Sequence, residues 1–212
     1  MRSTGLFISR VIFGGYLAVH GAQKLFGAFE GHGLETTSAG FHALGLQPGK
    51  VMATVAGASE LGGGVLTATG IADPLGPLVL AGTMVVASTV HRKQGALMQK
   101  GGFELPLTNF ALAVALLSAG SGSIRLGPRL SKPLTTLSAV GGASLAAYSV
   151  SQLLRAKPPV ADDDAGAGAG ADAAAAGADA AADGQAESAP ATSESDSDSK
   201  PQRRKKSEPA AS

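Results

Sequence analysis

Glu60 is the residue with the clearest chemical potential, because it stands alone in an apolar stretch. It is the only ionisable side chain between Val51 and Ile71, and it lies near the middle of that stretch. A stretch of about 20 apolar residues crosses a bilayer, and a carboxylate at its midplane costs roughly 3 kcal/mol. Since the short side chain of Glu60 cannot reach water from that depth, we expect it to face other helices and to have a polar partner.

Other ionisable residues are expected in the same half of the membrane as Glu60. His20 and Lys24 lie near the end of the first apolar stretch, and His91 and Glu104 flank the connection between the third and fourth stretches. Adjacent spans run antiparallel, so all five positions approach one half of the bilayer. Such a set can donate hydrogen bonds to a bound molecule and exchange protons with it. It can equally serve to lock the helices together.

Several of these residues also have plain structural interpretations. Arg10 and Lys24 can extend along their helix to lipid headgroups. His91 begins a His-Arg-Lys cluster typical of a membrane surface, and Glu104 near a helix start interacts favourably with the helix dipole. The His and Glu residues named so far could also be arranged as metal ligands, but no local ligand spacing requires it, and we predict no metal site.

Glycines accompany the polar residues at helical spacing. At about 100° per residue, the glycines of the first stretch share a stripe with Arg10 and Lys24, and those of the second share a face with Glu60. Glycines on a helix face let another backbone approach closely. The helix-packing glycines that we predict are Gly14, Gly21, Gly57 and Gly64. The basic partners that this packing could bring to Glu60 are Arg10, His20 and Lys24.

Five apolar stretches must position these residues. They cover residues 6–26, 51–71, 75–90, 105–120 and 134–154. The first four predict transmembrane helices. The fifth has no charge and the right length, but its many small and hydroxyl residues leave two alternatives, a fifth span or a helix lying at the interface. The connection over residues 27–50 is predicted to be polar, and residues 41–46 could form a short interfacial turn of helix.

The expected fold class is therefore all-α. We predict an integral membrane bundle of four core helices plus a fifth, with domain boundaries at 1–125 for the core and 126–155 for a basic turn and the fifth helix. Residues 156–212 are rich in Ala, Gly, Asp and Ser and end in a basic cluster. Such a segment buries too little apolar surface to offset its chain entropy, so we predict a disordered tail. Basic residues place the N-terminus outside if there are five spans, and inside if there are four.

Composition removes several classes of function. The chain has no Cys, which excludes disulfides, thiolate metal sites and cysteine nucleophiles on this polypeptide. The net charge of +1 gives no indication of nucleic-acid binding. No flavin, haem or iron–sulfur motif is present in the sequence, so electrons for any redox reaction must come from a partner or directly from a substrate.

Four motifs occur in order along the first half of the chain. The first stretch reads R-x3-G-x5-HG-x2-K-x2-G from Arg10, and the second reads G-x2-E-x-GGG from Gly57. The third gives M-x2-A-x3-H, ending at His91, and a G-x-E ending at Glu104 follows. Over about residues 5–125 this order resembles the DoxX family of small bacterial membrane proteins.

The resemblance implies a four-helix membrane core in the bacterial plasma membrane and a link to redox metabolism. The family is related to a subunit of a thiosulfate:quinone oxidoreductase, and some members are thought to anchor or assist soluble oxidoreductases. The polar positions that the resemblance carries over are Arg10, His20, Lys24, Glu60, His91 and Glu104. The fifth stretch and the long tail depart from the short family pattern, which indicates a tethering or partner-binding role for the tail.

Three functional hypotheses follow. The first is a redox-associated membrane subunit that binds quinone and works with a soluble oxidoreductase partner. The second is a non-enzymatic anchor or assembly protein that recruits partners through its tail. The third is a small-solute or proton-coupled transporter, for which a homo-oligomer would supply additional helices.

Overall fold

The structure is a computed structural model that describes residues 2–156. The predicted disordered tail lies outside the described residues, apart from its first residue. Within them the chain forms six α-helices and two short 3-10 helices, with one isolated β-bridge and no strand. The all-α prediction is therefore confirmed.

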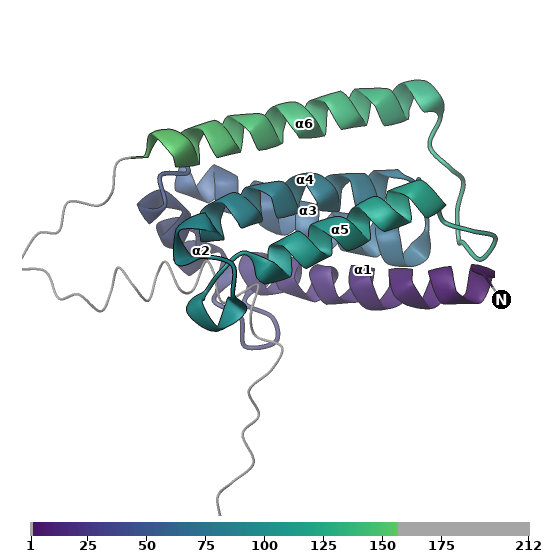
Figure 1. The fold of residues 1–212 in the computed structure, drawn as a ribbon, viewed down its shortest axis with the longest axis horizontal. Helices are drawn as coiled ribbons and strands as arrows, with labels where there is room; N and C mark the ends of the chain where they lie inside the picture. Colours follow the sequence, from purple (N-terminus) through teal and green to yellow (C-terminus); the bar gives the residue numbers. More distant parts are fainter. Residues whose placement is uncertain (1, 157–212) are drawn as a thin grey trace, which may run out of the picture.

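The helices follow the apolar stretches closely. In chain order they are α1 (Arg2–Phe26), α2 (Gly33–Ala43), α3 (Gly49–Thr69), α4 (Leu75–Val90), η1 (His91–Gln94), η2 (Met98–Lys100), α5 (Glu104–Ala119) and α6 (Lys132–Arg155). All but α2, η1 and η2 run along the long axis of the bundle (Figure 1). The start of α1 and the end of α6 lie at opposite ends of that axis.

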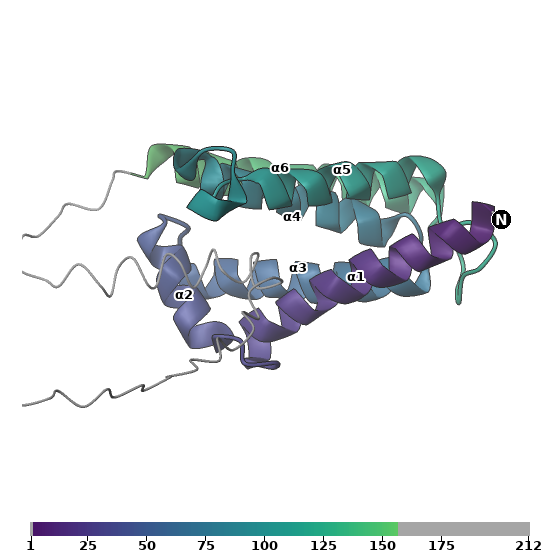
Figure 2. The same ribbon diagram turned by 60° about the horizontal axis from the view of Figure 1, so that its bottom comes forward.

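The helices form two layers. Figure 2 shows α1, α2 and α3 in one layer and α4, α5 and α6 in the other. Buried apolar residues fill the space between the layers, including Leu17 from α1, Leu80 and Met84 from α4, and Leu116 from α5. Large apolar residues remain exposed on the outside, such as Ile12 at 67% and Leu137 at 69%. In a bilayer these outer faces contact lipid tails, so their exposure carries no penalty.

Among the helices of the described residues, three are long and apolar enough to cross a membrane. They are Ser3–Phe26 in α1, Gly49–Thr69 in α3 and Lys132–Arg155 in α6, and α5 is a shorter apolar helix. The fifth apolar stretch is thus among the helices that satisfy the length requirement. It packs against α4 and extends along the bundle beside it (Figure 1).

The polar connection over residues 27–50 contains a longer helix than predicted, α2. The predicted helical turn at 41–46 overlaps only its end. The hydroxyl groups of Thr37 and Ser38 donate hydrogen bonds to the carbonyl oxygens of Gly33 and Leu34, one turn earlier in the helix. These bonds satisfy the two hydroxyl groups within the helix. In the sequence, the same polar residues made the helix difficult to recognise. Gly40 and Thr37 are then buried as α2 packs on the start of α3.

Close packing of α1 on α3 depends on glycine. A Cβ atom added at Gly14 would approach the carbonyl oxygen of Gly64 to less than 3.0 Å, and one added at Gly64 would approach that of Gly14 equally closely. About two helical turns further along α1, a Cβ atom added at Gly21 would meet backbone atoms of Gly57 and Leu61. The four predicted packing glycines therefore lie in one α1–α3 seam, where only a hydrogen atom fits between the backbones.

Candidate functional site

The α1–α3 seam brings two opposite charges together inside the bundle. The Nζ atom of Lys24 donates to Oε2 of Glu60 across 2.6 Å. Lys24 is 5% exposed and Glu60 is 5% exposed. Both residues are one turn from a seam glycine, Gly21 on α1 and Gly57 on α3, so the close approach of the backbones sets the distance between the charges. Lys24, one of the three candidate partners of Glu60, thus forms an ion pair with it.

His20 occupies the turn of α1 before Lys24 and faces the same way. Its exposure is 4%, and its ring packs edge-on against that of Tyr16, with centroids 4.4 Å apart and an interplanar angle of 82°. Residues four apart lie one above the other on a helix. Tyr16, His20 and Lys24 therefore form a polar row along the buried face of α1.

This polar row and Glu60 line a cavity of about 180 Å³ between the two layers. Most of the wall is apolar and comes from the remaining helices. It includes Phe41 from α2, Met52 from α3, Met84 and Val90 from α4, and Leu145 from α6. The cavity is partly open to the outside of the bundle. An apolar space with a few convergent polar groups is the usual form of a small-molecule site.

Of the candidate site residues named from the sequence, only His20, Lys24 and Glu60 line the cavity. Asn109 of α5 and Gly82 of α4 both border the cavity. The available signal for Asn109 was an amide inside a predicted span, which is costly in a bilayer unless it has a partner. Gly82 gave no signal, because a glycine in an apolar stretch does not reveal which neighbour it faces.

His91 and Glu104 lie apart from the cavity wall. His91 is 5% exposed, and its Nδ1 atom lies 2.7 Å from the carbonyl oxygen of Gly101. Glu104 is exposed, and its Oε2 atom accepts from the backbone N–H of Met98 at 3.2 Å. Both side chains hold the connection between α4 and α5. The described residues contain no group of three His, Asp or Glu side chains placed to hold a metal ion.

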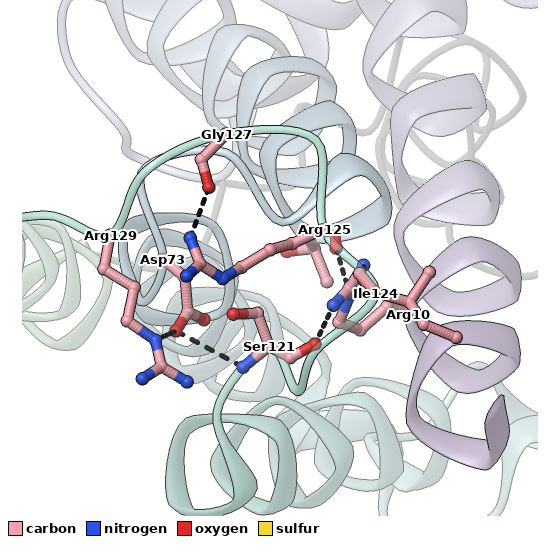
Figure 3. Close-up of polar contacts among 8 residues, drawn as sticks. Arg10, Asp73, Ser121, Ile124, Arg125, Gly127 and Arg129 are labelled. Atoms are coloured by element: carbon pink, nitrogen blue, oxygen red, sulfur yellow. Dashed lines mark hydrogen bonds and ion pairs between the residues drawn. The ribbon is translucent and has the colours of Figure 1, made fainter. Parts of the chain in front are cut away.

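Arg10 belongs to a separate network at the other end of the bundle (Figure 3). It is 2% exposed, so its guanidinium does not extend to the surface. Its Nε atom donates to the Thr67 carbonyl at 3.1 Å, and Nη2 donates to the carbonyls of Ala68 and Ile124 at 3.3 and 3.0 Å. Nη1 donates to the Ser121 carbonyl. The cation thus caps the end of α3, where the helix dipole favours positive charge.

Asp73 connects the same network to the turn between α3 and α4. Its Oδ2 atom accepts from the Ser121 backbone N–H at 3.3 Å and pairs with Arg129 Nε at 3.5 Å. An isolated bridge joins Asp73 and Arg129 along the backbone. Together with Arg10, these bonds fasten the loop between α5 and α6 onto the end of α3 (Figure 3).

Part of the chain is similar to a known protein family. Residues 5–92 match the family model of DoxX. The match assigns this segment of the chain to the DoxX family. The DoxX match covers α1 to α4 with His91 and Arg92, and therefore Arg10, His20, Lys24 and Glu60, whereas α5 and α6 follow after it. No curated protein and no solved structure matches the chain.

The DoxX match of residues 5–92 agrees with the helix lengths and the apolar outer faces. Together they indicate a multi-pass membrane protein. The ion pair of Lys24 and Glu60 is buried inside the bundle, where each residue is 5% exposed. In such surroundings a charge pair interacts more strongly than it would at a wet surface.

Proposed function

We propose that this DoxX protein is a redox-associated subunit of the bacterial plasma membrane that binds the head group of a quinone in the cavity between its helix layers. The observation that supports the proposal is the buried ion pair of Lys24 and Glu60 in the wall of an otherwise apolar cavity. A quinone has the matching chemistry, because its ring is flat and apolar and its carbonyl oxygens accept hydrogen bonds.

The size and the wall of the cavity suit one ring system. An apolar cavity of about 150 Å³ is known to hold benzene. The present cavity, of about 180 Å³, can hold a head group, and an isoprenoid tail can leave through its open part toward lipid. The ammonium of Lys24 carries three donors and spends one on Glu60, so donors remain for a carbonyl oxygen.

Reduction of a quinone to a quinol takes up two electrons and two protons. His20 and the Lys24–Glu60 pair are groups that can pass protons to the two oxygens. The electrons come from a soluble oxidoreductase partner in this proposal, because the chain has no Cys and no motif for a redox cofactor of its own. The protein is then the membrane half of a two-part system.

A second candidate is a non-enzymatic anchor in which the charges only lock α1 to α3. It is favoured by one specific observation, the direct pairing of Lys24 with Glu60. In that case the cavity wall would have no ligand to bind. The two candidates differ in the effect that a substitution in the cavity wall should have on bound quinone.

Bound quinone measured in purified protein separates these candidates. Wild-type protein in nanodiscs should carry quinone in near-stoichiometric amount, and Glu60→Gln should lose most of it. Glu104→Gln is the matched control, since it makes the same chemical change at an exposed residue outside the cavity wall. If wild type and Glu60→Gln both lack quinone while the variant melts earlier, the structural lock is the better account.

A cavity-filling variant tests the same proposal without touching a charge. A Cβ atom at Gly82 would meet nothing closer than the Gly142 carbonyl oxygen at 3.9 Å, so a larger side chain enters open space. Gly82→Leu should exclude quinone and keep or raise the melting temperature, because Leu also favours the helix. Gly62→Leu is the control, on an exposed face with open space. Full quinone retention in Gly82→Leu would contradict binding in this cavity.

A further inference from the structure

Most polar side chains that line the cavity already have partners within the protein. Lys24 is paired with Glu60, and the hydroxyls of Thr83 and Ser149 donate to the carbonyl oxygens of Val79 and Leu145 on their own helices. Asn109 differs from them. Its half-buried amide borders the cavity and makes no hydrogen bond to any other residue in the described part of the chain.

The position of Asn109 along the bundle can be derived from the network around Arg10. Arg10 contacts both the last turn of α3 and Ser121, and Asp73 contacts Ser121 as well, so the ends of α3 and α5 lie at one level. Asn109 lies ten residues before the end of α5 at Ala119, and this corresponds to about 15 Å at 1.5 Å per residue.

The polar groups of the other layer lie at the same depth. Glu60 is nine residues before the end of α3 at Thr69, or about 13.5 Å, and His20 is ten residues after Arg10, or about 15 Å. His20 and Glu60 belong to the layer of α1 and α3, whereas Asn109 belongs to the layer of α4 and α5 (Figure 2). Polar groups therefore border the cavity from two layers at one level.

We propose that Asn109 is a specificity-determining residue that binds the second oxygen of a flat ligand whose first oxygen meets Lys24 or His20. This inference rests on the proposed function and deepens it. The ligand class that fits is a ring with oxygen atoms on opposite edges, as in a 1,4-quinone or its quinol. The amide of Asn109 can donate to the carbonyl of a quinone and accept from the hydroxyl of a quinol, so one residue serves both oxidation states.

Asn109 should discriminate against ligands that lack oxygen. A site built to hydrogen-bond a ligand rejects the analogue without that group, because the polar group of the site is then left unpaired. The compounds that isolate this effect are menadione, which is a 1,4-naphthoquinone without a tail, and 2-methylnaphthalene, which is the same ring system without oxygen.

The test is the affinity of both compounds for wild type, Asn109→Leu and Thr108→Val in nanodiscs, with protein-free nanodiscs as the blank for partitioning. Asn109→Leu should weaken menadione binding roughly five- to tenfold, the effect of one lost hydrogen bond, and leave 2-methylnaphthalene binding unchanged or tighter. Thr108→Val is the matched control, since Thr108 is exposed and donates to the Glu104 carbonyl of its own helix. It should bind both compounds as wild type does.

Three results would overturn the inference. Equal weakening of both compounds by Asn109→Leu would mean that Asn109 only shapes the cavity, and unchanged menadione binding would mean that it makes no contact. In both cases the proposed function survives, because wild type still binds menadione. Wild type that binds neither compound overturns the proposed function as well. If Asn109→Leu melts early, Asn109→Ala is measured in its place, with the same expectations.

Discussion

Two buried cations on α1 illustrate how side-chain chemistry selects a partner. Arg10 donates to backbone carbonyls of α3 and of the loop after α5, whereas Lys24 meets a single carboxylate. A guanidinium presents donors in a planar fork and suits several carbonyls at once, while an ammonium acts as a compact point charge. Arg10 therefore holds the fold at one end, and Lys24 belongs to the cavity at the other.

The energetic role of the Lys24–Glu60 pair can be separated from its role in binding. Lys24→Met or Glu60→Met alone leaves an uncompensated buried charge, which costs about 3–5 kcal/mol. For a chain of this size that lowers the melting temperature on the order of 10 °C. The double variant removes both charges and should recover most of the loss, since apolar replacements of buried ion pairs are often neutral.

Thermal unfolding of the three variants in nanodiscs, with bound quinone measured on the same samples, checks this prediction. We expect the double variant to melt near the wild-type temperature and still to lack quinone. A double variant that is as unstable as either single variant would argue against charge burial as the cause. One that is stable and retains quinone would remove the ion pair from the proposed site.

Among the elements, the pair of α1 and α3 determines the geometry of the site. Their backbones touch through Gly14 and Gly64 and again through Gly21 and Gly57. Glu60 lies between these two contacts on α3, and Lys24 lies one turn beyond the second contact on α1. α6 contributes in a different way, because it closes the cavity wall from the second layer. Gln152 fixes its far end by exchanging hydrogen bonds of 2.9 Å with the backbone of Gln47.

Two neighbouring glycines of α1 give a matched test of the seam. A Cβ at Gly14 would overlap backbone atoms of α3, whereas a Cβ at Gly15 would meet nothing within 4 Å. Gly14→Ala should destabilise the protein by about 1–3 kcal/mol, the usual cost of overpacking. Gly15→Ala should be neutral or stabilising by up to about 1 kcal/mol through helix propensity. Melting curves of the two variants test this prediction. Equal curves would show that α1 and α3 can move apart at the seam without loss of stability.

For the whole molecule, the two ends of the bundle are expected on opposite sides of the membrane. Ser123, in the loop between α5 and α6, donates to Ser3 near the start of α1 at 2.8 Å, and Gln47 meets Gln152 near the end of α6. If α6 crosses the membrane, Lys50, Arg92 and Lys93 lie on the Gln47 side. The positive-inside rule then favours that side as cytoplasmic.

The absence of Cys from the whole chain allows a clean test of sidedness. Ser123→Cys should react with a membrane-impermeant maleimide in intact cells, and Gln47→Cys should react only after permeabilisation. Both positions are exposed, so access to the reagent depends on the membrane rather than on burial. Wild type gives the unlabelled baseline. Labelling of both variants in intact cells would contradict the expected arrangement.

Much of the fold was determined by local sequence alone. Apolar stretches of sufficient length specify helices in a bilayer, and the predicted stretch at 75–90 coincides with α4. The stripe of glycines on the first two stretches follows from helical period, which is a local property. Glu60 could be singled out from the sequence because the cost of a charge in lipid does not depend on what surrounds the helix.

Tertiary structure alone decided which polar residues meet. Helical phase put Arg10 and Lys24 on one stripe, yet their separation along α1 places them in different networks. Whether Glu60 meets an arginine or a lysine depends on how far α1 slides along α3, and that offset is fixed by where the seam glycines interlock. The contribution of Asn109 to the cavity likewise depends on the packing of the second layer, because no pattern within α5 records which helix it faces.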